Sequence, residues 1–351
     1  MAVVAGLDVG GAHLKVALVE DGRVVAVEQL SCPLWQGMDK LDDALAEARP
    51  LLRRAGHHGV TMTGELSDHF RDRKAGVEAL VARLAAEFGP EVRFWRGRHG
   101  FGSPAEALRS HADVASTNFL ATAEVVGRKI GEALLIDLGS TTTDIIPISG
   151  GAPVPRGLTD RERLRTGELV YTGLTRTSVM GITTRAPLAG QWQTLCREHF
   201  ATMADVRRIL GELADDVDHH ATADGRGKSR DESLARFARL FGCDAADADP
   251  DAWREAARFT ADAQLSSILE GCSQVISRNP ELHEAKVVAA GIGSDVAAAL
   301  AGRLGLSCVT FGELVNATGD CRRAATRSAP AAAVALLVGE QPGIQIFVGA
   351  H

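Results

Sequence analysis

The sequence lacks several features that mark whole classes of protein. It has one tyrosine in 351 residues and only 5% aromatic residues. No uncharged apolar stretch reaches the roughly 18 residues that a membrane-spanning helix needs. The N-terminus has no basic segment before its first apolar run and meets Asp8 early, which argues against a signal peptide. We therefore expect no membrane association and a cytoplasmic enzyme.

Cysteine pairs and excess positive charge are likewise absent. The six cysteines contain no C-x-x-C pair, so neither a zinc knuckle nor a disulfide framework is expected. The formal net charge of −7 gives no basic field that would attract nucleic acid or anionic lipid. Nucleic acid is therefore not an expected partner, and any phosphate has to be bound by a local site.

The length and the apolar content indicate a folded chain of two lobes. A chain of 351 residues is too long for one ordinary core, and 45% hydrophobic residues at a mean hydropathy near zero are typical of a globular protein. Residues 1–128 plus 325–351 are predicted to form lobe I, and residues 129–324 lobe II. A helix of small residues over 329–338 is predicted to return the chain to lobe I.

Two stretches repeat the same order of apolar run, aspartate, glycine-containing turn and second apolar run. One covers residues 3–19 around Asp8, and the other covers residues 134–148 around Asp137. One such hairpin alone is equally well explained as an ordinary tight turn. Two of them, about 130 residues apart, predict a duplicated fold with a ligand between the lobes. The predicted phosphate-binding residues of the turns are Gly10, Gly11, Gly139, Ser140, Thr141 and Thr142.

Charged side chains complete the two hairpins. Asp8, Asp137 and Asp144 suit a hydrated Mg²⁺ better than direct contact with an anion. Lys15 lies just past the first turn, where an ammonium group can meet a phosphate. The two hairpins therefore predict a phosphate site with a metal ion.

A third element covers residues 287–304 and reads as a strand, a Gly-x-Gly turn at Gly291 and Gly293, and a helix whose N-terminus can hold a phosphate or nucleotide. With these three elements in this order, the chain resembles the acetate/sugar kinase, Hsp70 and actin superfamily. The resemblance implies an α/β, duplicated, two-lobed actin-like ATPase/sugar kinase (ribonuclease H-like) fold with a ligand cleft between the lobes. It does not fix the reaction, because one fold hosts many reactions.

Two further polar stretches have open interpretations. Residues 59–68 end in Glu65 and Asp68, which either cap a turn or contact metal or substrate. Residues 157–177 carry arginines that either meet an anionic substrate or are surface charge. These arginines are Arg163, Arg165 and Arg176.

Residues 192–213 are predicted to be mainly helical and lead into a polar loop. In that loop His219 and His220 are poor zinc ligands as a pair, because adjacent histidines point apart. Glycines around Arg226 and before Lys228 favour a mobile lid that brings both cations to phosphates.

Residues 61–68, 157–171 and 221–229, taken with the two hairpins, resemble the hydantoinase/oxoprolinase-type proteins linked to tetrahydromethanopterin C1 transfer. The resemblance implies a transferase of methanofuran or methylofuran biosynthesis. Such an enzyme would join 5-(aminomethyl)-3-furanmethyl diphosphate to the phenol of a γ-glutamyl-tyramine or tyrosine-type acceptor, forming an ether and releasing diphosphate. A composition rich in Ala, Arg and Asp favours a bacterial methylofuran as product.

This reaction implies roles for the predicted site residues. Mg²⁺ with diphosphate is the implied cofactor, held on the side of Asp8 and Asp137, with Lys15 and the turns as the cradle. The base that accepts the phenol proton stays open among Asp8, Glu65 and His220.

The main alternative is an ATP-dependent small-molecule kinase, which would use the same turns for the β- and γ-phosphates and the Gly291 region for adenosine. A nucleotide-gated binding module is less favoured, because no segment is left over for a peptide-binding domain. The expected partners are small-molecule substrates, and a homodimer is left open.

Overall fold

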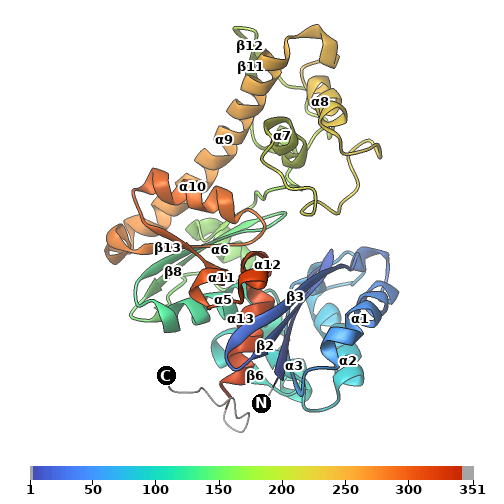
Figure 1. Cartoon of the computed structure of the whole chain (residues 1–351), viewed down its shortest axis with the longest axis vertical. Helices are drawn as coiled ribbons and strands as arrows, with labels where there is room; N and C mark the ends of the chain where they lie inside the picture. Colours follow the sequence, from blue (N-terminus) through green and yellow to red (C-terminus); the bar gives the residue numbers. More distant parts are fainter. Residues whose placement is uncertain (1–2, 342–351) are drawn as a thin grey trace.

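The computed structural model describes residues 3–341, which form two lobes and a third body carried on a long helix (Figure 1). None of the helices in this range is both long and apolar enough to cross a membrane. The three bodies have separate apolar cores, and a fourth apolar cluster joins the two lobes.

Lobe I is built on a six-stranded sheet in the order β3-β2-β1-β4-β5-β6. Its first three strands are antiparallel, β4 runs parallel to β1, and β5 runs parallel to β4. Two helices cover one face, and the buried residues of α1 follow the predicted i, i+3, i+4 stripe. The elements are β1 (Val3–Val9), β2 (His13–Glu20), β3 (Arg23–Ser31), α1 (Asp39–Leu52), β4 (His57–Met62), α2 (Arg73–Phe88), β5 (Arg93–Trp95), β6 (Phe101–Gly102), α3 (Pro104–Arg109) and α4 (His111–Val114).

Lobe II repeats this plan with the sheet order β10-β8-β7-β13-β14 and with β9 paired to β8. An antiparallel hairpin, β7–β8, is again extended by parallel strands. Helix α10 and the C-terminal part of α9, from Leu265 onward, cover one face of this sheet. The elements are β7 (Ala133–Leu138), β8 (Thr143–Ser149), β9 (Ala152–Pro153), α6 (Asp160–Thr166), β10 (Leu169–Val170), α9 (Pro250–Ser277), β13 (Lys286–Ala290), α10 (Ser294–Leu304), β14 (Cys308–Thr310), α11 (Phe311–Leu314) and α12 (Arg322–Arg327).

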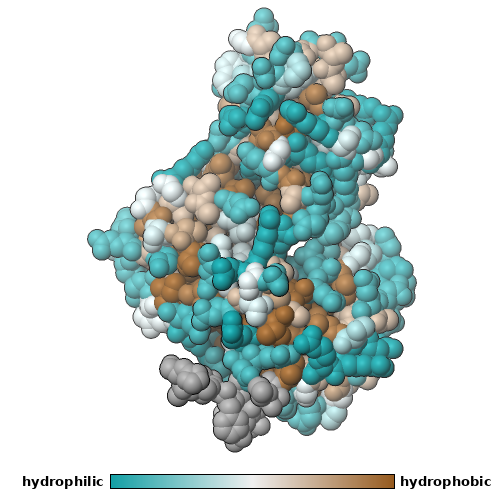
Figure 2. Space-filling view, viewed as in Figure 1, coloured by the Kyte–Doolittle hydropathy of each residue, from teal (hydrophilic) through white to brown (hydrophobic). Residues whose placement is uncertain are grey.

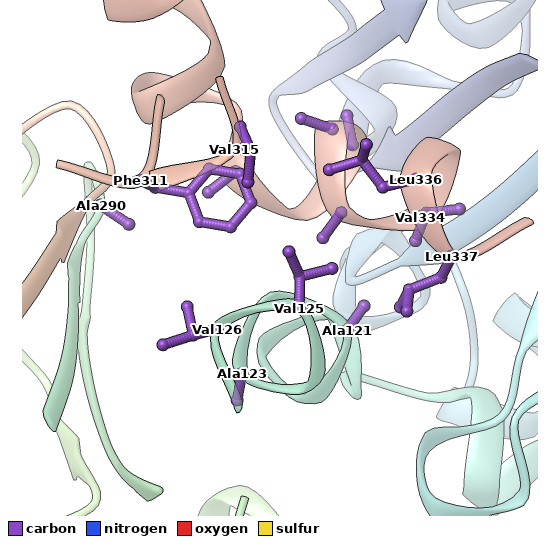
Figure 3. Packing of buried hydrophobic residues seen from close by; sticks show 14 of the residues in the cluster. Ala121, Ala123, Val125, Val126, Ala290, Phe311, Val315, Val334, Leu336 and Leu337 are labelled. Carbon is purple, nitrogen blue, oxygen red and sulfur yellow. The ribbon is translucent and has the colours of Figure 1, made fainter. Parts of the chain in front are cut away.

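Two helices lie between the sheets, α5 (Asn118–Lys129) and α13 (Ala329–Gly339) (Figure 1). In Figure 3, Val125 of α5 points toward α13, and Phe311 and Val315 close one side of the cluster. Helix α13 packs on β1, β2 and β4, so the predicted return of residues 329–338 to lobe I is confirmed.

A third body is inserted into lobe II and was not separated from it by the sequence. It contains β11 (Arg185–Leu188), β12 (Gln191–Thr194), α7 (Met203–Leu210), α8 (Arg230–Arg239) and the outer part of α9, around a core of its own. We call it the inserted module. Figure 1 shows it at the top, joined to lobe II by α9.

The prediction of helix over most of 192–213 is wrong. Ala189 and Gly190 both have positive φ, and Leu188 pairs with Gln191, which makes a tight two-residue hairpin turn before the helix begins at Met203. Across this hairpin, the guanidinium carbon of Arg185 lies 4.5 Å from the ring centroid of Trp192. Residues 192–213 therefore contain the end of a hairpin, a loop and only a short helix.

The close fit of α13 on lobe I gives a first prediction. A Cβ added at Gly6 would overlap the Ala331 carbonyl oxygen and lie 2.5 Å from the Ala335 amide nitrogen. Gly6→Ala should therefore lower the free energy of unfolding by about 3 kcal/mol or more, because backbone cannot move aside as a side chain can. Urea unfolding would measure the loss.

Gly56→Ala is the matched control, since no atom lies within 4 Å of a Cβ placed there. Equal urea midpoints for the two variants would show that α13 does not pack against the backbone of β1 at Gly6.

Candidate active site

The two hairpin turns face each other across a cleft of about 700 Å³, within the usual size range of small-molecule sites. Ten of the predicted site residues line it, and they come from both lobes. These are Asp8, Gly10, Gly11, Lys15, Asp137, Gly139, Ser140, Thr141, Thr142 and Asp144. The sequence therefore located the centre of the cleft. Figure 2 shows the surface indented at the right of the view, between lobe I and the inserted module.

The two hairpins match residue for residue. Asp8 pairs with Lys15 across β1 and β2, and Asp137 pairs with Asp144 across β7 and β8. Each turn is closed in the same way, because the Gly10 amide donates to the His13 carbonyl and the Gly139 amide donates to the Thr142 carbonyl, both at 2.9 Å. The backbone is therefore duplicated, whereas the charge opposite each aspartate has changed sign.

Asp8 is a buried carboxylate with incomplete partners. Its Oδ2 lies 3.6 Å from Lys15 Nζ, and its Oδ1 has no hydrogen-bond partner in the described part of the chain. Burial raises the pKa of Asp8 above its ordinary value, and the Lys15 ammonium opposes the rise. A buried carboxylate oxygen without a donor is a position that a cation or a hydrated cation can satisfy.

The surroundings of Asp137 also disfavour the ionised form of its carboxyl group. Burial, together with the neighbouring carboxylates of Asp144 and Asp8, raises its pKa to about 7, and the Lys15 ammonium opposes this rise. Carboxylates gathered in one cleft repel each other unless a positive charge joins them. Asp137 and Asp8 are thus the pair best suited to the metal side of the site.

Asp144, the third predicted metal residue, is already engaged. It accepts a hydrogen bond from the buried Arg163 Nη2, whose guanidinium carbon lies 3.7 Å from the Phe119 ring centroid. The same Nη2 also donates to the Glu168 carbonyl at 3.2 Å. Arg163 therefore compensates the charge of Asp144 instead of offering a free guanidinium to substrate.

Residues 3–341 contain no group of three or more His, Cys, Asp or Glu side chains arranged to hold a metal ion directly. Two carboxylates from opposite lobes instead suit an ion that keeps several of its waters and takes further ligands from phosphate oxygens. Mg²⁺ binds in this way in many phosphate sites. The residues present thus fit the predicted ion with Asp8 and Asp137 as its protein side.

Arg176 is the cation that the sequence considered but left out of the predicted site. It lines the cleft, and its Nη1 donates to Thr141 Oγ1 at 3.4 Å. The segment before it returns under the second turn, where the Leu174 and Arg176 amides donate to the carbonyls of Gly139 and Ser140 at 2.9 Å each. This backbone bonding places an exposed guanidinium beside the phosphate turn.

Gly291 and Gly293 lie outside the cleft lining. Their amides donate to the carbonyls of Thr326 and Leu138, both at 2.9 Å, so neither N–H points at a ligand. A Cβ at Gly291 would overlap Leu138 and Asp137. These glycines therefore allow the close approach of the β13–α10 turn to the end of β7, which corrects their predicted contact with phosphate.

Arg226 and Lys228 also lie outside both cavities described here. Lys228 Nζ donates to the Asp218 carbonyl at 2.6 Å, and Arg226 is exposed. The loop between them is tied to α8, because the Gly227 amide donates to Glu232 and its carbonyl accepts from Arg236, both at 3.0 Å. The structure thus does not place these cations at the cleft, and a lid movement stays a prediction.

Glu65 lies behind the cleft wall. It is almost fully buried, and its Oε1 accepts a 2.6 Å hydrogen bond from the hydroxyl of Ser116, which does line the cleft. Burial raises the pKa of Glu65 above its ordinary value, and the Ser116 hydrogen bond opposes the rise. Asp68 lines the cleft directly. Glu65 can therefore reach a ligand only through Ser116.

His220, the other predicted base, lines a second cavity of about 320 Å³. It meets His13 of lobe I, with ring centroids 5.2 Å apart, and His219 lies 5.6 Å from the same ring. Burial, together with nearby cations including Arg176, lowers the pKa of His13 to about 3 and that of His220 to about 4. The rings of His13, His219 and His220 form a contact between lobe I and the inserted module.

The sequence did not single out His13, although a signal was present. His13 occupies the position in the first hairpin that Thr142 occupies in the second, as the two turn hydrogen bonds show. Aligning the two hairpins by their aspartates would have placed His13 at the cleft.

Comparison with known proteins identifies relatives of this chain. A family model described as hydantoinase/oxoprolinase matches residues 57–338. A protein of Methanocaldococcus jannaschii is 32% identical over 243 residues, covering 69% of this chain and 72% of the relative. It is named (4-{4-[2-(gamma-L-glutamylamino)ethyl]phenoxymethyl}furan-2-yl)methanamine synthase. A Methanococcus vannielii protein of the same name is 33% identical over 121 residues, covering 34% of this chain and 54% of that protein.

Among solved structures, the nucleotide-free structure of acetone carboxylase aligns with a TM-score of 0.52 at 11% identity. The alignment covers 86% of this chain and 67% of the other. At this identity the likeness concerns the fold alone. The predicted duplicated, two-lobed α/β fold is confirmed.

The histidine contact predicts how stability depends on pH. A histidine whose pKa is lowered on folding binds fewer protons folded than unfolded, so its contribution is lost as pH falls from about 6.5 toward the folded value. His13→Gln should therefore show a smaller drop in Tm between pH 7 and pH 5 than the unaltered protein does. Differential scanning fluorimetry at both pH values measures it.

His283→Gln is the control, because His283 is exposed and lies between α9 and β13, outside this group of rings. If His13→Gln and His283→Gln lose the same Tm as the unaltered protein on acidification, His13 is not held neutral by the fold.

Proposed function

This chain belongs to the hydantoinase/oxoprolinase family, and from that premise we propose that it is a transferase of methanofuran or methylofuran biosynthesis. The reaction would condense 5-(aminomethyl)-3-furanmethyl diphosphate with the phenol of a γ-glutamyl-tyramine or tyrosine-type acceptor. The names of the two relatives as synthases of such an ether support it. The observation that carries the proposal is the cleft itself, with Asp8 and Asp137 on matching hairpins and Lys15 and Arg176 beside the turns.

The cleft supplies what a diphosphate leaving group requires. Asp8 and Asp137 would hold Mg²⁺, which when bound neutralises diphosphate charge and makes diphosphate a better leaving group. Lys15 and Arg176 bring two cations to the same region, and the hydroxyls of Ser140 and Thr141 add donors. Asp8 is buried and Asp137 is half-buried, so water screens these charges less than it would at the surface.

The bond changes need positioning more than a strong nucleophile. The bond between the furanmethyl carbon and a diphosphate oxygen breaks with its electron pair on diphosphate, and the ring oxygen delocalises the positive charge left on carbon. The phenol oxygen then forms the new bond to that carbon and loses its proton. Holding the phenol within about 3–3.5 Å of the carbon and excluding water supplies most of the acceleration.

For the phenol proton we favour Glu65 acting through Ser116. The Ser116 hydroxyl faces the cleft and already donates to Glu65, so it can receive the phenol proton as it passes its own to the carboxylate. Burial raises the pKa of Glu65, which makes it a better proton acceptor than a solvated glutamate. Asp8 is assigned to the metal side and has one carboxylate oxygen 3.6 Å from Lys15 Nζ, and His220 lines the second cavity.

The kinase alternative has less support. It assigned adenosine to the region of Gly291 and Gly293, whose amides are bonded within the protein. Two experiments separate the alternatives. Incubation with the furanmethyl diphosphate and γ-glutamyl-tyramine, followed by mass spectrometry, should detect the ether and free diphosphate. Thermal shift should be larger with Mg-diphosphate than with Mg-ATP, and transfer of phosphate from ATP to a furan alcohol would instead establish the kinase.

Replacement of the two aspartates tests the metal side. Asp8→Asn and Asp137→Asn should each reduce turnover by at least about 10³-fold while circular dichroism stays unchanged, because each removes a carboxylate that faces the cleft. Raising the Mg²⁺ concentration should partly restore the weaker variant. Near-normal turnover of both variants at limiting Mg²⁺ would remove the metal assignment.

Arg176→Ala and Lys228→Ala decide which cation meets the diphosphate. Arg176→Ala should lower kcat/KM for the diphosphate substrate about 100-fold, roughly the 2–3 kcal/mol of a charge-assisted contact. Lys228→Ala should have a much smaller effect, because Lys228 is bonded to Asp218. The opposite order of effects would mean that residues 221–229 close over the cleft and that Arg176 is only a surface charge.

A further inference from the structure

The second cavity adjoins the cleft and has no role in the reaction steps above. It shares Trp35 and Arg176 with the cleft, so the two spaces meet at these side chains. Most of its wall belongs to the inserted module, including α7 and the loop before α8. A substrate that reaches into the cleft from this side would therefore have part of its length in the module.

The carboxylates in its wall are already neutralised. Asp205 accepts from Arg236 Nε and Nη2 at 3.0 and 2.7 Å, and Asp218 accepts from Arg208 Nη2. Lys228 Nζ lies 3.6 Å from the Asp218 carboxylate as well. These acids thus position the arginines of the module and leave little negative charge to repel an anion.

Donors, by contrast, remain available. Arg208 Nη1 lies 3.9 Å from Asp205 Oδ1, too far for a hydrogen bond, and Arg208 lines the cavity. His220 Nε2 is buried and has no partner among residues 3–341, although His220 also lines the cavity. With the exposed Arg176, the wall presents donors that a carboxylate would satisfy.

An aromatic side chain stands where the two spaces meet. Trp35 lines both and is 46% exposed, which is unusual for so large an apolar ring. An aromatic ring of a ligand can pack on it in an offset or edge-on arrangement. A ligand with a phenol at one end and a carboxylate at the other would match the order of cleft, tryptophan and cavity.

We infer that the second cavity binds the glutamyl carboxylate of the phenol acceptor, through Arg208 and His220, while the phenol ring packs on Trp35 and its oxygen enters the cleft. This inference rests on the proposed function. It makes the inserted module the part that selects the acceptor, and the two lobes the part that holds the diphosphate.

Comparison of two acceptors tests it. For γ-glutamyl-tyramine and for tyramine, which lacks the glutamyl group, kcat/KM is measured in the unaltered enzyme and in Arg208→Gln. The ratio of the two values should fall about 30-fold in Arg208→Gln, because the lost contact is made by only one acceptor. Arg208→Lys should recover part of the ratio. Arg197→Gln, at an exposed arginine of the same module outside both cavities, should leave it unchanged.

A second measurement needs no variant, in case Arg208→Gln fails to fold. L-2-Aminobutyrate, which matches the carboxylate end of the glutamyl group and shares no atom position with tyramine, should inhibit competitively against γ-glutamyl-tyramine and should not compete with tyramine. An unchanged ratio in folded Arg208→Gln, or equal inhibition against both acceptors, would overturn the inference. Absence of ether with either acceptor in the unaltered enzyme would instead refute the proposed function.

Discussion

The close packing of α13 between the lobes is the constraint on which the cleft depends. Its backbone lies against β1 at Gly6, and Val334 and Val338 occupy the space beside Gly59 of β4, so helix and sheet approach at a distance that side chains would prevent. On its other side α13 packs against α5, which in turn packs on the strands of lobe II. Because interiors are densely packed, this stack fixes the two sheets and therefore the two turns that end them. Pro330, near the start of α13, lines the cleft itself.

Within this frame the duplicated hairpins differ in charge. Lys15 faces Asp8 in the first, whereas Asp144 stands in the equivalent place in the second and is compensated by Arg163 from α6. Arg163 packs on the ring of Phe119 and donates to the backbone carbonyl of Glu168. The buried carboxylate of Glu168 in turn accepts a hydrogen bond from Arg278 at 2.7 Å. A buried pair of this kind is costly to break because either partner alone would be an unsolvated charge. The two hairpins therefore contribute unequally, with the Lys15 ammonium from lobe I and carboxylates from both.

The inserted module changes what a two-lobed fold can do. A cleft with phosphate turns is common to many reactions, so it says little about the second substrate. Here the module adds a separate wall next to the cleft, and its loop reaches lobe I through the rings of His13, His219 and His220. Arg176, at the junction of lobe II and the module, lines both spaces. In the proposed reaction, the acceptor and the leaving group would thus be bound by different parts of one scaffold.

The sequence by itself determined the elements whose signals are local. Alternating apolar residues around an aspartate and a glycine turn predicted both hairpins, the helical stripe predicted α1, and the repeat of the hairpin predicted two lobes with Asp8 and Asp137 at a shared cleft. Such patterns depend on neighbours a few residues apart, which the sequence lists in order.

Only the tertiary structure decided which distant side chains meet. It brought Arg176 under the second turn and His13 against the module, held Lys228 on Asp218, and used Gly291 for close packing instead of ligand binding. It also placed residues 192–194, the start of the predicted helix over 192–213, in the second strand of a hairpin. These outcomes depend on hydrogen bonds and contacts between residues far apart in the chain, and no local periodicity records which partner a donor or a buried charge will find.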